Sequence, residues 1–251
     1  MDSTSTSINK GKLFAYLLAV LTLLAFVVFI VLRQSERFTL SVYQPYSNLI
    51  LKGITNTIWV SILSLIGSLI LGFIFYLLSI SKIKYFVALT NIIREIIYGT
   101  PLLVLVIVTA YLIGPAFNSY QRNFLGIMAL IIYMTPYMMN VYKSAFVSIS
   151  NDQFLAMDLF GFTPYQRYRY IIIPQVIRIL MPPMMNNFSM IIKGSALLNV
   201  LSFTELYYAV TVAQSRTFAY VEGYIIMWGL YLIITIPISI LTKWMERKYA
   251  L

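Results

Sequence analysis

The stretch NDQFLAMDLFGFTPYQRYRYIIIPQ, residues 151–175, is a polar interruption in an otherwise apolar chain. Ser150 and Gln153 have the spacing of an N-terminal capping box, in which a hydroxyl and an amide satisfy the free N–H groups that begin a helix. Gly161 can end the helix in the left-handed conformation. We therefore predict one short helix over residues 151–160.

A second capping pattern follows the glycine. Thr163 and Gln166 repeat the spacing, and Pro164 occupies the first helical position, where its missing N–H costs nothing. Pro174 lies ten residues further on and is expected to limit this second helix. The interruption is thus predicted to be a helix, a turn and a helix.

The first of these helices carries more apolar surface than a solvated loop needs. Such surface normally marks a contact with another protein. Packing of the helix under the chain's own membrane domain is an equally weighted alternative. DNA binding by a helix-turn-helix is strongly disfavoured, because membrane spans lie a few residues away on both sides. The apolar side chains are Phe154, Leu155, Met157, Leu159 and Phe160.

The composition places the rest of the chain in a bilayer. Of the 251 residues 60% are hydrophobic and 10% are charged, and the mean hydropathy is +0.84. The polar intervals are too short to hold a separate soluble core, so we expect one membrane domain. The chain has no cysteine and no histidine, which removes thiol nucleophiles, histidine bases and the usual transition-metal ligands. We expect no metal site and no cofactor on this chain.

Apolar stretches of about 20 residues are long enough to cross a hydrocarbon core of about 30 Å. Ser64, Ser68 and Gly72 recur at intervals of four in the second stretch and predict close helix packing. Pro136 is expected to kink the fourth. Pro182 and Pro183 are expected to interrupt the fifth. The six predicted spans are Leu13–Leu32, Thr55–Ile80, residues 99–114, Phe124–Ile149, Val176–Val200 and Tyr224–Thr242.

The net charge of +10 is read as a topology signal, because cytoplasmic loops collect lysine and arginine. With a cytoplasmic N-terminus the outer segments hold only Arg33, Arg37, Lys52, Arg122 and Arg216. The inner segments then hold Lys10, Lys12, Lys82, Lys84, Arg94, Lys143, Arg167, Arg169, Arg178, Lys243, Arg247 and Lys248. Both termini and residues 151–175 are therefore predicted to be cytoplasmic.

Lys193 is the one clear charge inside a predicted span, so it should face protein or water. It is expected to line a translocation path or hold a gate; a structural tie to Glu205 or to backbone carbonyls is the alternative. Tyr137 and Asn140 offer hydrogen bonds to a zwitterionic solute, although amides in helix bundles more often join helices. Glu95 is expected to pair with Arg94 at the inner mouth.

At residues 151–175 the chain resembles the cytoplasmic loop of permease subunits of ATP-binding-cassette importers, whose pattern is E-A-A-x-x-x-G, nine residues, then I-x-L-P. Ala156, Gly161, Ile171 and Pro174 stand at the required spacing, with Ile173 for the leucine. The alignment extends over about residues 50–248 and includes segments typical of polar amino-acid permeases. These segments begin at Glu95 and contain GTPLL, PQVIRILMPPMMNN and IIKGSALLNVLSFTEL.

The resemblance implies an all-α integral membrane protein with the type I importer permease fold, about six transmembrane helices and a cytoplasmic helix-turn-helix coupling loop. Residues 1–50 would be an N-terminal tip, an extra anchor helix and an outer loop, and residues 51–251 the permease core. The ATPase-coupling residues would be Phe154, Leu155, Ala156, Asp158, Gly161 and Pro174. The path or gate would hold Lys193, Ser195, Tyr137, Asn140 and Glu205, and the inner mouth Glu95, Gly99, Thr100 and Pro101.

The resemblance also implies partners. These are a cytoplasmic ATPase dimer that binds ATP and Mg, a second permease copy, an extracellular solute-binding protein and the lipid of the cell membrane, with no nucleic acid. The sequence contains no G-x-x-x-x-G-K-[ST] phosphate loop, in keeping with ATP hydrolysis on another chain. The function implied is uptake of an amino acid or similar small polar solute by alternating access.

The chain departs from the family pattern at several positions. Leu155 replaces the loop glutamate, and Asp152 or Asp158 is expected to substitute for that glutamate. Tyr98 replaces the arginine that precedes the Gly-Thr-Pro segment at residues 99–101. Asn140 and Gly194 stand where acidic residues are usual. These departures suggest that the chain is a diverged copy that forms one half of a heterodimeric pore. A self-contained secondary carrier or channel is the alternative function, although no inverted repeat is found.

Overall fold

The computed structural model describes residues 10–34 and 38–249, and all regular structure in these ranges is helical. The predicted N-terminal tip and Arg37 lie outside the described residues. Four segments, η1 to η4, are short 3₁₀ or π helices. The elements are α1 Lys10–Gln34, η1 Leu40–Tyr46, α2 Ser47–Ser79, α3 Lys84–Gly99, α4 Leu102–Val108, η2 Thr109–Ile113, α5 Gly114–Ala116, α6 Arg122–Val147, α7 Asn151–Leu159, α8 Pro164–Gln166, η3 Arg167–Ile172, α9 Ile173–Gly194, η4 Ser195–Leu201, α10 Leu206–Thr217 and α11 Tyr220–Tyr249.

Four helical stretches are individually long and apolar enough to cross a membrane: Leu13–Gln34, Leu40–Ser79, Arg122–Val147 and Tyr220–Tyr249. Two further spans are bent pairs of helices. Lys84–Gly99 and Leu102–Ala116 meet at 111°, and the helices on either side of residues 202–205 meet at 49°. The predicted six spans are thus reached when each bent pair is counted as one.

Helices α2 and α6 pack against each other through the small residues of α2. Ser64 and Ser68 are fully buried, and a Cβ added to Gly72 would lie 2.5 Å from the Cβ of Met138. Small side chains let two backbones approach closely, which is the main source of helix association in lipid. The predicted packing face is confirmed.

Two predictions about prolines are wrong. Pro174 does not end the second short helix, because α8 runs through η3 into α9, whose first turn contains Pro174. The π-helical turns of η3 come directly before it, and such local adjustments accommodate a residue that lacks an N–H. Pro182 and Pro183 lie inside α9 without interrupting it. Pro136 lies inside the continuous helix α6, and the kink expected there stays a prediction.

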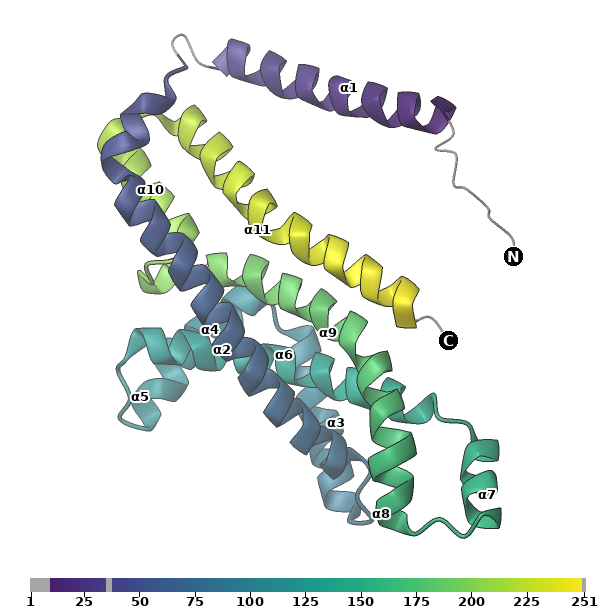
Figure 1. The fold of residues 1–251 in the computed structure, drawn as a ribbon. Coiled ribbons are helices and arrows are strands. Elements are labelled where there is room, and N and C mark those ends of the chain that lie inside the picture. Colours follow the sequence, from purple (N-terminus) through teal and green to yellow (C-terminus); the bar gives the residue numbers. More distant parts are fainter. Residues whose placement is uncertain (1–9, 35–37, 250–251) are drawn as a thin grey trace.

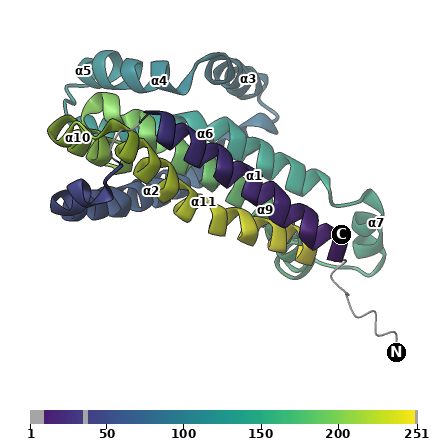
Figure 2. The same cartoon turned by 90° about the horizontal axis from the view of Figure 1, so that it is seen from above.

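The two ends of the bundle carry different elements. In both views α7 and the C-terminal end of α11 lie at one end, and α5 and α10 lie at the other (Figures 1 and 2). The first residues of α1 lie at the same end as α7, while α1 itself extends apart from the bundle (Figure 1). The side chains of the span in α1 are unburied in this single chain.

Candidate functional site

Both ends of α7 are held by local contacts. The Ser150 hydroxyl accepts a hydrogen bond from the Gln153 N–H at 3.4 Å. Gly161 adopts φ +66°, the left-handed conformation that favours glycine, and a Cβ there would meet no atom within 4 Å. Glycine is therefore favoured at residue 161 by the backbone conformation and not by a lack of space for a side chain. The predicted helix and glycine turn are confirmed.

The turn after α7 is tied back to the helix by an ion pair. Arg167 Nη1 lies 2.5 Å from Asp158 Oδ1, and its Nε donates to the Phe162 carbonyl at 2.8 Å. The predicted capping box of Thr163 and Gln166 is present with both of its hydrogen bonds. Helix α7 is thus attached to the start of the long helix that contains α9.

The apolar side chains of α7 divide between two faces. Met157 is buried and Phe154 half-buried against a core cluster that includes Ile172 of η3. The side chains of Leu155, Leu159 and Phe160 are 61%, 88% and 80% exposed. Packing against the chain's own helices therefore accounts for Met157 and Phe154, whereas contact of the exposed face with another protein stays a prediction.

A shallow groove of about 270 Å³ lies beside α7. The groove is mostly apolar and is flanked by the exposed Phe160 side chain. An open apolar surface of this kind suits an inserted side chain from a partner. It is lined by Gln153, Ala156, Met157, Phe160, Phe162, Ile171 and Gln175.

A second cavity, of about 240 Å³, lies between α4, α6 and α9, and the exposed residue Lys193 is part of its lining. The described residues form two ion pairs, Arg94–Glu95 and Asp158–Arg167, and neither includes Lys193. The alternative of a tie between Lys193 and Glu205 is therefore wrong. The lining residues are Leu102, Leu130, Tyr133, Met134, Met190, Ile191 and Lys193.

Glu205 is instead fully buried at the start of α10. Its carboxylate accepts hydrogen bonds from the N–H groups of Tyr207 and Tyr208, and from the Tyr231 hydroxyl at 2.9 Å. Ser195 is also buried and donates to the Ile192 carbonyl at 2.8 Å. Neither side chain lines the cavity that Lys193 lines, although Ser195 follows Lys193 closely in the sequence.

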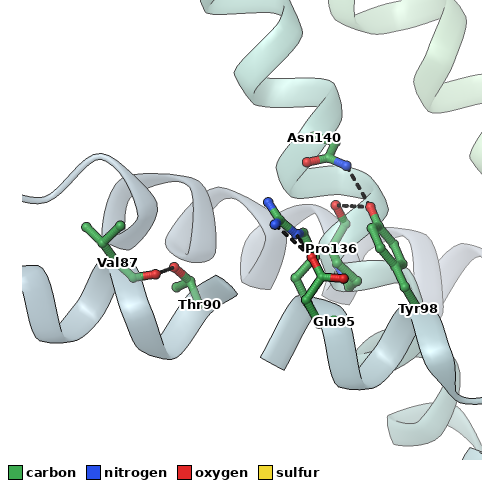
Figure 3. Close-up of polar contacts among 7 residues, drawn as sticks. Val87, Thr90, Glu95, Tyr98, Pro136 and Asn140 are labelled. Atoms are coloured by element: carbon green, nitrogen blue, oxygen red, sulfur yellow. Dashed lines mark hydrogen bonds and ion pairs between the residues drawn. The ribbon is translucent and has the colours of Figure 1, made fainter. Parts of the chain in front are cut away.

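A cluster of tyrosines links this cavity to the end of α3. The rings of Tyr133 and Tyr137 lie 5.5 Å apart, and those of Tyr137 and Tyr98 lie 5.1 Å apart. Asn140 donates from Nδ2 to the Tyr98 hydroxyl at 2.6 Å, and that hydroxyl donates to the Pro136 carbonyl at 3.4 Å (Figure 3). The structure thus brings together Tyr137 and Asn140, and it joins α6 to α3.

The predicted inner-mouth residues lie around this cluster. Glu95 pairs with its neighbour Arg94 at 2.8 Å, as predicted, and both residues precede Tyr98 on α3 (Figure 3). Gly99, Thr100 and Pro101 form the break at which α3 bends into α4. The Thr100 hydroxyl donates to the Ile96 carbonyl at 2.6 Å and so caps the end of α3.

Sequence reasoning missed Tyr133, Tyr231 and Arg167. Tyr133 could have been found, because it precedes Tyr137 by four residues and Asn140 by seven, which places all three on one helix face. Arg167 and Tyr231 could not, because their partners Asp158 and Glu205 are brought to them by a turn and by tertiary packing.

The chain is similar to known transport proteins. Residues 68–251 match the family described as "Binding-protein-dependent transport system inner membrane component". The "Probable glutamine ABC transporter permease protein GlnM" of Bacillus subtilis is 30% identical over 78% of this chain and 91% of that protein. The "Glutamine transport system permease protein GlnP" of Escherichia coli is 28% identical over 84% of this chain and 98% of that protein.

Solved structures have the same architecture. A chain of the "Crystal structure of an amino acid ABC transporter with histidines" superposes with a TM-score of 0.77 at 27% identity, covering 85% of this chain and 100% of that one. A chain of the inward-facing MetNI methionine ABC transporter gives a TM-score of 0.64 at 16% identity and shares the fold.

Proposed function

The chain belongs to the family of binding-protein-dependent transport system inner membrane components, and from this premise we propose that it imports an amino acid as the membrane-spanning subunit of an ATP-driven transporter. The observation that carries the proposal is the match over most of the chain to amino-acid permeases of two bacteria. Neither the family nor the relatives support a self-contained carrier or channel.

The translocation path runs along one face of α6. It begins at the cavity that holds Lys193 and continues past Tyr133, Tyr137 and Asn140 to the break at residues 99–101. Hydroxyl and amide groups offer a solute both donors and acceptors in an otherwise apolar span. Ser195 and Glu205 hold the segment between α9 and α10 in place beside the path.

Coupling to ATP takes place at α7. Leu155, Leu159 and Phe160 enter the interface with a partner ATPase, and Ala156 leaves room in the groove for a side chain of that partner. Phe154, Asp158, Gly161 and Pro174 keep α7 attached to α9, so a displacement of the ATPase moves the helix that carries Lys193. The motion biases the inward- and outward-open states differently, as alternating access requires.

The working assembly contains more than this chain. A cytoplasmic ATPase dimer binds ATP and Mg, an extracellular binding protein delivers the solute, and a second permease copy completes the pore. The permease is a multi-pass protein of the cell membrane with both termini cytoplasmic. Residues 51–251 form its core, to which Tyr43 and Ile50 add buried side chains, and α1, which lies within residues 1–50, is an addition.

The test is purification of the tagged protein from its native membrane in mild detergent, with the bound chains identified and their ATPase activity measured. The wild type should recover an ATPase. Phe160→Asp combined with Leu155→Asp should lose at least about nine tenths of it, because two charges are placed in an apolar contact.

Phe117→Asp is the matched control. Phe117 is 80% exposed, as is Phe160, but it lies at the opposite end of the bundle beside α5. It should leave ATPase recovery unchanged. Recovery of the permease alone from wild-type membranes would overturn the proposed function, and equal recovery with both variants would overturn the role of α7.

A further inference from the structure

A third cavity, of about 430 Å³, lies between α9 and the C-terminal end of α11, and it reaches Ser148 at the end of α6. Its volume falls in the range of about 300–1,000 Å³ that is typical of small-molecule sites. It shares none of its described lining residues with the cavity at Lys193 or with the groove beside α7. It is therefore a separate candidate for binding.

The cavity is lined by two charges of opposite sign, Arg178 on α9 and Glu246 on α11. Among the described residues, neither charge takes part in an ion pair. Both side chains are exposed, so their charges are accessible to a ligand. Glu246 follows the buried Thr242 by four residues and thus lies on the face of α11 that is turned toward the bundle.

Two neutral polar side chains add to these charges. The Ser148 hydroxyl donates to the Ala145 carbonyl at 2.8 Å, so its oxygen can still accept a hydrogen bond. The exposed amide of Asn186 on α9 adds a donor on the same helix as Arg178. The cavity thus offers acceptors at Glu246 and Ser148 and donors on α9. This combination suits a zwitterion, in which an ammonium and an anionic group lie a few atoms apart.

The cavity lies at the depth of the lipid headgroups. Helix α6 has 26 residues, which extend about 39 Å at 1.5 Å per residue. A bilayer is about 40–45 Å thick with its headgroups and about 30 Å without them. Ser148, which directly follows α6, is therefore at the headgroup layer. Trp244, two residues before Glu246 and 51% exposed, is of a type that gathers at this layer.

The wall of the cavity along α9 is apolar between its polar ends. Arg178 and Asn186 are eight residues apart, or about 12 Å along the helix, and Ile179, Pro182 and Pro183 lie between them. An apolar stretch next to a charged group suits the glycerol and first acyl carbons of a lipid. A free amino acid has the same two charges but is too short to cover this stretch.

We propose that this cavity binds the headgroup of an aminophospholipid such as phosphatidylethanolamine. Its phosphate accepts hydrogen bonds from Arg178, and its ammonium donates to Glu246 and Ser148. Phosphatidylcholine has the same phosphate, but its methylated ammonium cannot donate. Phosphatidylglycerol has the phosphate and no ammonium. The inference needs only the membrane-spanning fold and does not depend on which solute is transported.

The experiment measures binding of dioleoyl lipids to the full-length protein in mild detergent by native mass spectrometry. Wild type should bind the ethanolamine lipid at least about fivefold more tightly than the choline lipid. Glu246→Gln should weaken the ethanolamine lipid about tenfold and leave the glycerol lipid within about twofold, because only the former has an ammonium. Arg178→Gln should weaken both lipids about tenfold, because both have the phosphate.

Arg169→Gln is the matched control. Arg169 is an exposed arginine of η3, at the same end of the bundle as α7, and it does not line the cavity. This change should leave all three affinities within about twofold. An equal loss in Arg169→Gln and Arg178→Gln would show general attraction of lipid to basic residues and would overturn the inference.

The wild type alone can also overturn the inference, whatever the variants do. Equal affinities for the ethanolamine and choline lipids would mean that Glu246 does not bind an ammonium. Arg178 and Glu246 would then simply pair with each other across the cavity. Displacement of the ethanolamine lipid by millimolar L-glutamine would assign the site to a free amino acid and overturn the lipid as its ligand. Retention of the lipid under glutamine supports the proposal.

Discussion

Among single residues, the Asp158–Arg167 ion pair bears on a departure from the family pattern at residues 151–175. Leu155 stands where the family has a glutamate, and Asp152 or Asp158 was expected to substitute for it. The carboxylate of Asp158 does form a 2.5 Å contact, with Arg167 of η3. The pair connects α7 to the membrane helix that follows, so we expect it to act on transmission of motion rather than on recognition.

We predict that Asp158→Asn and Arg167→Gln each lower ATP-driven uptake by about two- to fivefold, because a partly exposed pair contributes up to about 1 kcal/mol. Recovery of the ATPase should be unchanged, since Leu155 and Phe160 remain. The double exchange Asp158→Arg with Arg167→Asp should restore part of the uptake. Uptake at the wild-type rate in both single variants would contradict the role of the pair.

A second residue-scale prediction concerns the buried carboxylate of Glu205. Tyr231→Phe removes one of its hydrogen bonds and should lower the free energy of unfolding by about 1–3 kcal/mol. The measurement is the apparent unfolding temperature in nanodiscs. Tyr224→Phe is the control on the same helix, because Tyr224 is 58% exposed. Equal unfolding temperatures for the two variants would show that the bond to Glu205 is not stabilising.

At the scale of elements, the contact of α2 with α6 organises the bundle. It sets the position of α6, which carries Tyr133, Tyr137 and Asn140 along the proposed path. The bends at residues 99–101 and 202–205 bring α4 and η4 against the same helix. The path therefore depends on how closely α6 is held.

We predict that Gly72→Ala destabilises the protein by about 1–3 kcal/mol, because the new Cβ would lie 2.5 Å from Met138 Cβ and 3.1 Å from the Met139 nitrogen. Gly229→Ala is the matched control in α11, where a Cβ would meet no atom within 4 Å. That change should be neutral or stabilising by up to about 1 kcal/mol, since alanine favours helix more than glycine. A similar loss of stability in both variants would show that crowding at α6 is not the cause.

At the scale of the whole molecule, the arrangement in the membrane follows from charge and from the two ends of the bundle. The coupling segment and the end of α11 lie together, and the loop beside α5 lies opposite (Figure 1). The excess of basic residues on the first side predicts that this side is cytoplasmic.

The absence of cysteine from the sequence makes this orientation easy to test. Tyr165→Cys and Tyr120→Cys introduce single thiols at positions that are 69% and 71% exposed. A membrane-impermeant maleimide should label Tyr120→Cys in intact cells and Tyr165→Cys only after permeabilisation. The reverse pattern would invert the proposed topology, and labelling of both in intact cells would place both loops outside.

The fold class, the number of spans with bent pairs counted as one, and the helix and glycine turn at residues 151–161 could be predicted from the sequence. These features depend on local signals: lengths of apolar runs, the caps at Ser150 and Thr163, and a glycine at residue 161 that needs φ above zero. Local signals act between residues a few positions apart, so they can be read directly along the chain.

Only the tertiary structure decided which distant groups meet. It brought the Tyr231 hydroxyl to Glu205 and the Tyr98 hydroxyl to Asn140. Among the described residues it placed no carboxylate in an ion pair with Lys193. It also carried the helix through Pro174 and Pro182, against the local preference of proline. The physical reason is that packing between helices sets which polar groups share a low-dielectric interior, and there the cost of an unpaired group exceeds any local propensity.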